Sequence, residues 1–314
     1  MIFVADQERL AFLKGLADKV NKPASQDAYI YATVAAASID LQLGHYDDSR
    51  KKLDECERIL DSFDSVETVV HAAFYETSAD YYKVSVTLLA YADYVTKSKH
   101  KAKHDFSLYY RTALLYLACI DIDDLGASER QSRAYDLSIA ALVSEDIYNF
   151  GELLLHPILD SLTNSPNSWL RDLLFAFNRG DLAAYDVLRN HISSNQLLSS
   201  KKDFLHQKIC LAALTEAVFR RPPHDRAMTF ETIRRETRVG QDDIEHLIMK
   251  ALSLGLLKGT IDQVDEVAHI KWVQPKVLDK GQIENMRSRL REWDSSVFSL
   301  GNWIESVGQD VWAA

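Results

Sequence analysis

The sequence contains few of the residues that break helices. Its 314 residues include only 11 glycines and 6 prolines, and positions 24 to 156 contain no proline. All-β proteins need many glycine and proline turns, and disordered chains are usually richer in proline. The scarcity of both residues disfavours these two classes. We therefore expect a mainly α, globular protein, with two subregions at this length.

Other features are also scarce. The three cysteines, Cys56, Cys119 and Cys210, lie far apart, which argues against a disulfide framework or a paired metal site and favours a reducing compartment. The longest apolar run, Ala28 to Ile39, is shorter than the roughly 18 residues of a membrane span. The N-terminus lacks the basic and apolar regions of a signal peptide. Lysine and arginine total 36 against 46 acidic residues, and this net charge of −10 disfavours general nucleic-acid binding.

Apolar residues in the first 165 positions recur at the spacing of a helix. Successive helices with short connections stack in pairs in an α-solenoid, which is the architecture that we expect here. The stretch Leu41 to Tyr46, followed by Leu53, is similar to part of a tetratricopeptide repeat, but no clean repeat period is present. An irregular helical bundle remains the alternative. The expected helices span residues 28–43, 46–63, 66–84, 106–120 and 128–143.

Residues 166–221 continue the helical pattern. Gly180 and Asp181 are typical of a helix end followed by the N-cap of another helix. We expect a long helix from about Gln196 to Arg220, which Pro222 and the following proline end.

The pattern changes between residues 222 and 278. The pattern predicts two short helices, Phe230 to Arg238 and Gln241 to Leu254, followed by two alternating runs, Leu257 to Asp262 and Val267 to Trp272. The runs predict a β-hairpin. A helix–turn–helix followed by a hairpin is the plan of a winged helix.

Winged helices often bind DNA, but the charges of this one argue against that function. The second helix carries Asp242, Asp243 and Glu245 against a single Lys250. The segment 222–278 holds 8 basic and 9 acidic residues, a net charge of −1. Such charges repel phosphate, so we expect this domain to pack against protein.

The last 36 residues, 279–314, show the sharpest periodic signal in the chain. Apolar residues follow a 3-4-3-4 rhythm over four heptads, while the positions between them are polar. This seam predicts a long helix that packs with helices of other subunits. The alternative is a helix that folds back on its own domain. The seam residues are Ile283, Met286, Leu290, Trp293, Val297, Leu300, Ile304, Val307 and Val311.

The sequence contains no motif that supports chemistry. His100 and His104 lie four residues apart, but the glutamate of a zinc-protease motif is missing and lysines surround the pair. The run from Asp121 to Gly126 begins like a calcium loop but lacks the later ligands. Arg179 to Asp181 copies an adhesion tripeptide, which its position between two helices explains. We infer no catalytic residue, no metal site and no cofactor.

Four segments carry a resemblance to a known family, strongest from about residue 105 onward. Together with the helical repeats, the winged helix and the final helix, they resemble the PCI-domain family. This family comprises subunits of the proteasome lid, the signalosome and a translation initiation factor. Within it, the chain is most similar to a non-ATPase subunit of the lid. The segments are 149–157, 175–181, 249–265 and 272–279.

The resemblance implies a non-catalytic scaffold in the cytoplasm and nucleus. In the family, winged helices pack side by side and C-terminal helices gather into one bundle that licenses lid assembly. The implied partners are other PCI subunits, near the deubiquitinase module and a ubiquitin receptor, with neither membrane nor nucleic acid. An outward strand edge near Val267, His269 and Lys271 could extend a neighbour's sheet. A PCI subunit of a translation initiation factor or the signalosome, or a nucleic-acid-binding winged helix, is the alternative.

The same reasoning predicts four parts of the chain. They are a helical-repeat arm (1–165), the helical part of a PCI domain (166–221), a winged helix (222–278) and a C-terminal bundle helix (279–314). Members of the family carry a further helical stretch before the point that matches Met1.

Overall fold

The computed structural model of the chain describes residues 2–22, 25–63, 66–92, 99–163, 165–222, 225–275 and 280–312. Helices dominate this structure, which confirms the mainly α fold class. The chain divides into two compact units, Met1–Gln274 and Pro275–Ala314. The boundary between arm and PCI domain within the first unit stays a prediction.

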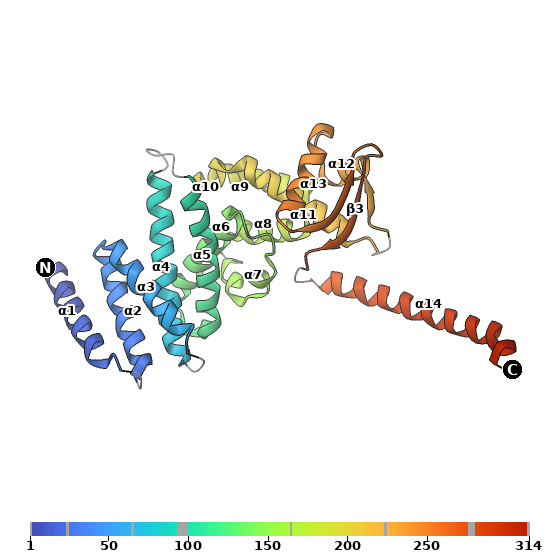
Figure 1. The fold of residues 1–314 in the computed structure, drawn as a ribbon. Helices are drawn as coiled ribbons and strands as arrows, with labels where there is room; N and C mark the ends of the chain where they lie inside the picture. The colour runs from blue at the N-terminus through green and yellow to red at the C-terminus, as the bar shows by residue number, and fades with distance from the viewer. Residues whose placement is uncertain are drawn as a thin grey trace. The chain divides into compact units, whose positions relative to one another are not determined.

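The first unit begins with helices that lie side by side in chain order (Figure 1). The first of them, α1, was not predicted. Its apolar side chains lie on more than one face: Leu10 and Ala17 are buried, while Phe12 is 71% exposed. This spread weakens the periodic signal of the helix in the sequence. The helices are α1 Ile2–Val20, α2 Gln26–Gln42, α3 Tyr46–Leu60, α4 Thr68–Ala92, α5 Lys99–Cys119 and α6 Ala127–Val143.

Buried polar contacts close the hairpin between α2 and α3. Gly44 ends the turn with a positive φ of 82°, which a glycine adopts without strain. The carboxylate of Asp40, only 1% exposed, pairs with the Lys52 ammonium. The Ser49 hydroxyl donates to the Ala37 carbonyl at 3.0 Å. A small core between α2, α3 and α4 packs beside these contacts.

The larger core extends from α4 to the last strand. The Asp181 carboxylate accepts hydrogen bonds from the N–H groups of Ala183 and Ala184, which confirms its predicted role as the N-cap of α9. The middle elements are the 3₁₀ turn η2 Ile122–Asp124, α7 Gly151–Leu155, η3 Pro157–Leu162, α8 Ser168–Arg179, α9 Leu182–Ser194, α10 Gln196–Ser200 and α11 Lys202–Phe219.

The single helix predicted from Gln196 to Arg220 is wrong. The Asn195 side chain caps α10, and Lys201 then leaves helical geometry at φ −116°, so a separate helix, α11, begins at Lys202. Apolar residues keep the spacing of a helix through both α10 and α11, so the sequence pattern did not reveal the break between them. The predicted end before Pro222 is close to the observed end of α11 at Phe219.

A winged helix completes the first unit, and both strands of the predicted hairpin are present. The three strands form an antiparallel sheet of order β1-β3-β2. The first strand is only three residues long and was not predicted. The elements are β1 Ala227–Thr229, α12 Phe230–Thr237, the 3₁₀ turn η4 Gln241–Asp243, α13 Ile244–Ser253, β2 Leu257–Asp262 and β3 Val267–Val273.

The second unit contains one described element, the helix α14, Lys280–Trp312. Its 33 residues make it about 50 Å long at 1.5 Å per residue. The helix predicted from the heptad pattern is therefore present.

Candidate interaction surfaces

The heptad seam forms one apolar stripe along α14. Its seven described side chains are all exposed, from 42% at Met286 to 66% at Trp293. Leaving such large apolar side chains in water forgoes about 1.5–3 kcal/mol for each one that could be buried. The exposed seam residues are Ile283, Met286, Leu290, Trp293, Val297, Leu300 and Ile304. The side chains of Val307 and Val311 lie outside the described residues.

Most of α14 outside the seam is polar, although Phe298 and Trp303, 69% and 60% exposed, also lie outside it. The helix surface opposite the seam carries Ser288 and Ser295, both exposed. Arg287 and Glu284 form an ion pair at 3.2 Å beside it. A helix with one apolar stripe and a polar back is the pattern of a coiled-coil or bundle helix. Since α14 is the only element described from Pro275 onward, its own unit supplies no second helix for the seam.

The predicted strand edge at Val267, His269 and Lys271 is wrong for its first two residues. These residues belong to β3, which is the central strand of the sheet. Val267 pairs with Thr229 and His269 with Ala227, so the missed strand β1 occupies that side. Lys271 lies on the same central strand, beyond the residues that β1 pairs. The outer strands of the sheet are β1 and β2.

Strand β2 is the longer of the two outer strands, with six residues against three. A β-bulge interrupts its pairing with β3 between Lys258 and Gly259. A Cβ atom at Gly259 would lie 2.2 Å from the His269 carbonyl oxygen, so only glycine fits this close approach. Outer strands carry unpaired backbone groups, which another strand can use.

The exposed surface of the winged helix is mixed in charge and partly apolar. Asp242 and Asp243 are exposed in the turn η4 that precedes α13, and Met249 on α13 is 53% exposed. On the sheet, the Lys258 ammonium lies 4.8 Å from the centre of the Trp272 ring. This surface lacks the basic helix face that a DNA reader needs, and it fits a protein partner better.

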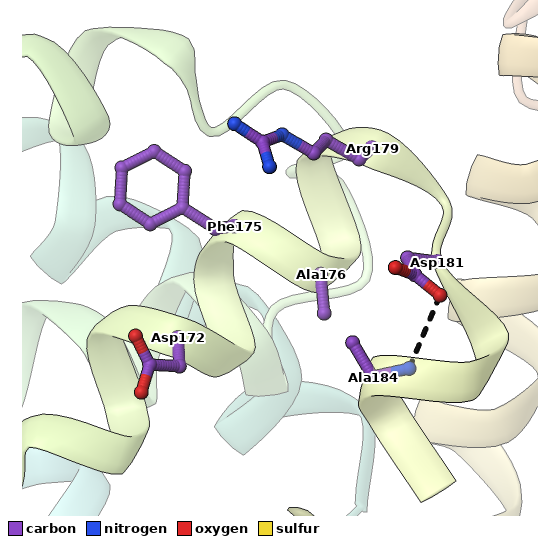
Figure 2. A pocket seen from close by; sticks show the side chains of 6 residues that line it. All are labelled: Asp172, Phe175, Ala176, Arg179, Asp181 and Ala184. Carbon is purple, nitrogen blue, oxygen red and sulfur yellow. Dashed lines mark hydrogen bonds between the residues drawn. The ribbon is translucent and has the colours of Figure 1, made fainter. Parts of the chain in front are cut away.

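A hollow of about 270 Å³ lies between α8 and α9 (Figure 2). Phe175 on its wall is flanked by the guanidinium groups of Arg171 and Arg179, each 5.7 Å from the ring centre. The Asp181 carboxylate accepts a hydrogen bond of 3.1 Å from the Ala184 N–H group, drawn as a dashed line in Figure 2, so this acid serves as a helix cap. The lining contains no histidine, serine or cysteine that Asp181 could activate, and we assign the hollow no chemistry.

Two of the three cysteines, Cys56 and Cys210, are buried. Burial raises the pKa of Cys56 to about 12 and that of Cys210 to about 11, which keeps both thiols protonated and unreactive. No three His, Cys, Asp or Glu side chains in the described part of the chain could hold a metal ion together. None of the described helices is long and apolar enough to cross a membrane.

Three protein-family models match successive parts of the chain. One described as PSD13 N-terminal repeats covers residues 3–174, and the PCI domain covers residues 182–272. One described as the Rpn9 C-terminal helix covers residues 276–308, which includes most of α14. The exposed seam therefore coincides with a segment that has a family model of its own.

Curated relatives agree with these matches. The chain is 42% identical over 98% of its length to a probable 26S proteasome regulatory subunit rpn9 of Schizosaccharomyces pombe, covering 76% of that protein. It is 41% identical over 84% of its length to the 26S proteasome regulatory subunit RPN9 of Saccharomyces cerevisiae, covering 63% of that protein. A eukaryotic translation initiation factor 3 subunit M of Coccidioides immitis is only 23% identical, over 66% of this chain and 44% of that protein.

Proposed function

Because the chain belongs to the Rpn9/PSD13 family of 26S proteasome regulatory subunits, we propose that it is a non-catalytic scaffold of the regulatory-particle lid. It would support lid assembly, and thereby ubiquitin-dependent protein degradation, through contacts with other lid subunits. The observation that carries the proposal is the exposed apolar seam of α14. The low identity to the translation initiation factor subunit disfavours that alternative.

The seam would enter a bundle of helices from several subunits. An a/d stripe of this length is stable in water only when other helices cover it. The assignment of Ile283, Met286, Leu290, Trp293, Val297, Leu300, Ile304 and Val307 to this bundle is part of the proposal.

The outer edge of β2 would supply a second contact, in place of the edge first expected on β3. Strand addition by a neighbouring winged helix would satisfy the unpaired backbone groups of β2. This position replaces the Val267, His269 and Lys271 surface, because β1 already covers the paired part of that side.

The resemblance also suggests the neighbourhood of the subunit. We place it among PCI subunits of the lid, near the deubiquitinase module and a ubiquitin receptor, in the cytoplasm and the nucleus. Chemical cross-linking of assembled particles, followed by identification of the linked peptides, would test this placement. The absence of cross-links from the first unit to either module would contradict this placement.

Affinity purification tests the scaffold function as a whole. A tagged full chain is expressed in place of the native subunit, and the proteins that accompany it are identified. Lid subunits should accompany it in equal amounts. Recovery of translation initiation factor subunits, or of nucleic acid without lid subunits, would overturn the proposal.

A further inference from the structure

A lysine lies fully inside the first unit, on α11. Lys208 is 1% exposed, and its ammonium nitrogen contacts three backbone carbonyl oxygens. The oxygens belong to Ala141 at 2.8 Å, Leu142 at 3.1 Å and Ser144 at 2.7 Å. These residues form the last turn and the C-cap of α6. Lysine is almost never fully buried unless other interactions replace those that its charge makes with water, and these three contacts are such interactions.

The three contacts determine which form of the side chain fits. A carbonyl oxygen only accepts, so three of them need three N–H donors from one nitrogen. An ammonium group has three such donors, whereas a neutral amine has two. The carbonyls at a helix C-terminus also carry the negative end of the helix dipole, which favours a cation. The geometry at Lys208 therefore favours the charged form.

Aromatic rings complete the surroundings of the ammonium group. The Lys208 nitrogen lies 5.3, 5.2 and 5.6 Å from the ring centres of Tyr148, Phe150 and Phe204. Ring faces attract a cation, and most strongly where water is absent. These rings and the α6 carbonyls replace the water that the ammonium loses on burial.

Burial and neighbouring charges both shift the pKa of Lys208. Burial has the largest effect and lowers the pKa of Lys208 well below its usual value, and the charge of Lys201 lowers it further. The carboxylates of Asp146 and Glu145 act in the opposite direction. Three hydrogen bonds to the charged form oppose the loss of the proton.

The two ends of this contact belong to different parts of the chain. Helix α6 lies in the segment that matches the N-terminal repeats, residues 3–174, and Lys208 lies in the segment that matches the PCI domain, residues 182–272. We propose that Lys208, as a buried ammonium capping α6, is a joint that holds the end of the repeat region on the PCI domain. It is a conformational device in the fold and does not depend on the proposed function.

Hydrogen exchange of the full chain tests the joint. Lys208→Met keeps an unbranched side chain but leaves three buried carbonyls without a donor. Loss of a charged hydrogen bond predicts at least about tenfold faster exchange of the amides in residues 141–150. Lys202→Met, which removes an exposed lysine from the same helix, should leave this exchange unchanged. Unchanged exchange in Lys208→Met, or an equal rise throughout the winged helix, would overturn the proposal.

The wild-type protein offers a second test, which holds even where Lys208→Met fails to fold. In protein labelled with ¹⁵N and ¹³C at lysine, the side-chain nitrogen and ε-carbon shifts of Lys208 report its protonation directly. Lys208→Arg serves to assign the signal by its disappearance. We expect the shifts of an ammonium at neutral pH. The shifts of a neutral amine would overturn the proposal.

Discussion

Helices α11 and α14 contrast two ways in which one chain uses apolar residues. Ten of the 18 residues of α11 are buried, and they contact α8, α9, α12 and α13 of the same unit. The 33 residues of α14 instead expose nine large apolar side chains, seven of them on one stripe. The first helix buries its apolar face within its unit, while the seam of the second is exposed. A stability measurement on the isolated chain should therefore respond to α11 and hardly to α14.

A matched pair of leucines gives the largest expected difference. Leu214 on α11 is 0% exposed and Leu290 on α14 is 60% exposed. Leu214→Ala should lower the free energy of unfolding by about 3–5 kcal/mol, since it leaves a cavity in the core. Leu290→Ala should change it by less than about 0.5 kcal/mol. Urea unfolding of both variants measures the contrast, and similar losses of unfolding free energy in the two variants would contradict it.

A pair of glycines sharpens the contrast around α11. Both have a positive φ, 65° at Gly180 and 82° at Gly44, but a Cβ at Gly180 would lie 2.6 Å from the Ala213 Cα atom of α11. Gly44 has open space around it. We expect Gly180→Ala to cost about 2–4 kcal/mol and Gly44→Ala about 1 kcal/mol, the cost of the backbone conformation alone. Equal shifts in thermal unfolding would show that close packing at α11 is not what requires glycine.

Mild acid should give the smallest effect, and it should act on the first unit. Burial lowers the pKa of His156, whose Nδ1 atom accepts the Ile158 N–H group at 3.3 Å. The unfolded chain binds this proton more readily, so stability falls as pH drops below about 6.5. His156→Asn can still cap but does not titrate. The gap in melting temperature between pH 7 and pH 5.5 should shrink in this variant, and an unchanged gap would contradict the assignment.

The sequence predicted those parts of the fold that local patterns encode. The period-2 runs of Leu257–Asp262 and Val267–Trp272 and the heptads of α14 were found because each pattern repeats within its own element. Strand β1 was missed because three residues, Ala227–Thr229, are too few to alternate visibly. Its pairing with β3 depends on residues about 40 positions away, and so the strand edge was misplaced.

Long-range contacts explain the other failures. Lys208 directly precedes the apolar run from Ile209 to Leu214. Nothing local shows that its ammonium contacts the end of α6, which lies 64 to 67 positions earlier. A lysine on the apolar face of a buried helix was the available signal. The seam on α14 was predicted, but the partners that we propose for it are other chains, which neither the sequence nor the structure of one chain contains.

The most direct test of the central claim compares two faces of α14 at equal spacing. Leu290→Asp with Val297→Asp places two charges on the seam, and Ser288→Asp with Ser295→Asp places the same charges, seven residues apart, on the opposite face. Each full-length variant replaces the native subunit, and its recovery with lid subunits is measured. We predict at least about tenfold lower recovery for the seam variant alone, as burial of two unpaired charges requires, with unfolding of the first unit unchanged. Equal recovery of the two variants would contradict the claim that the seam joins this chain to the lid.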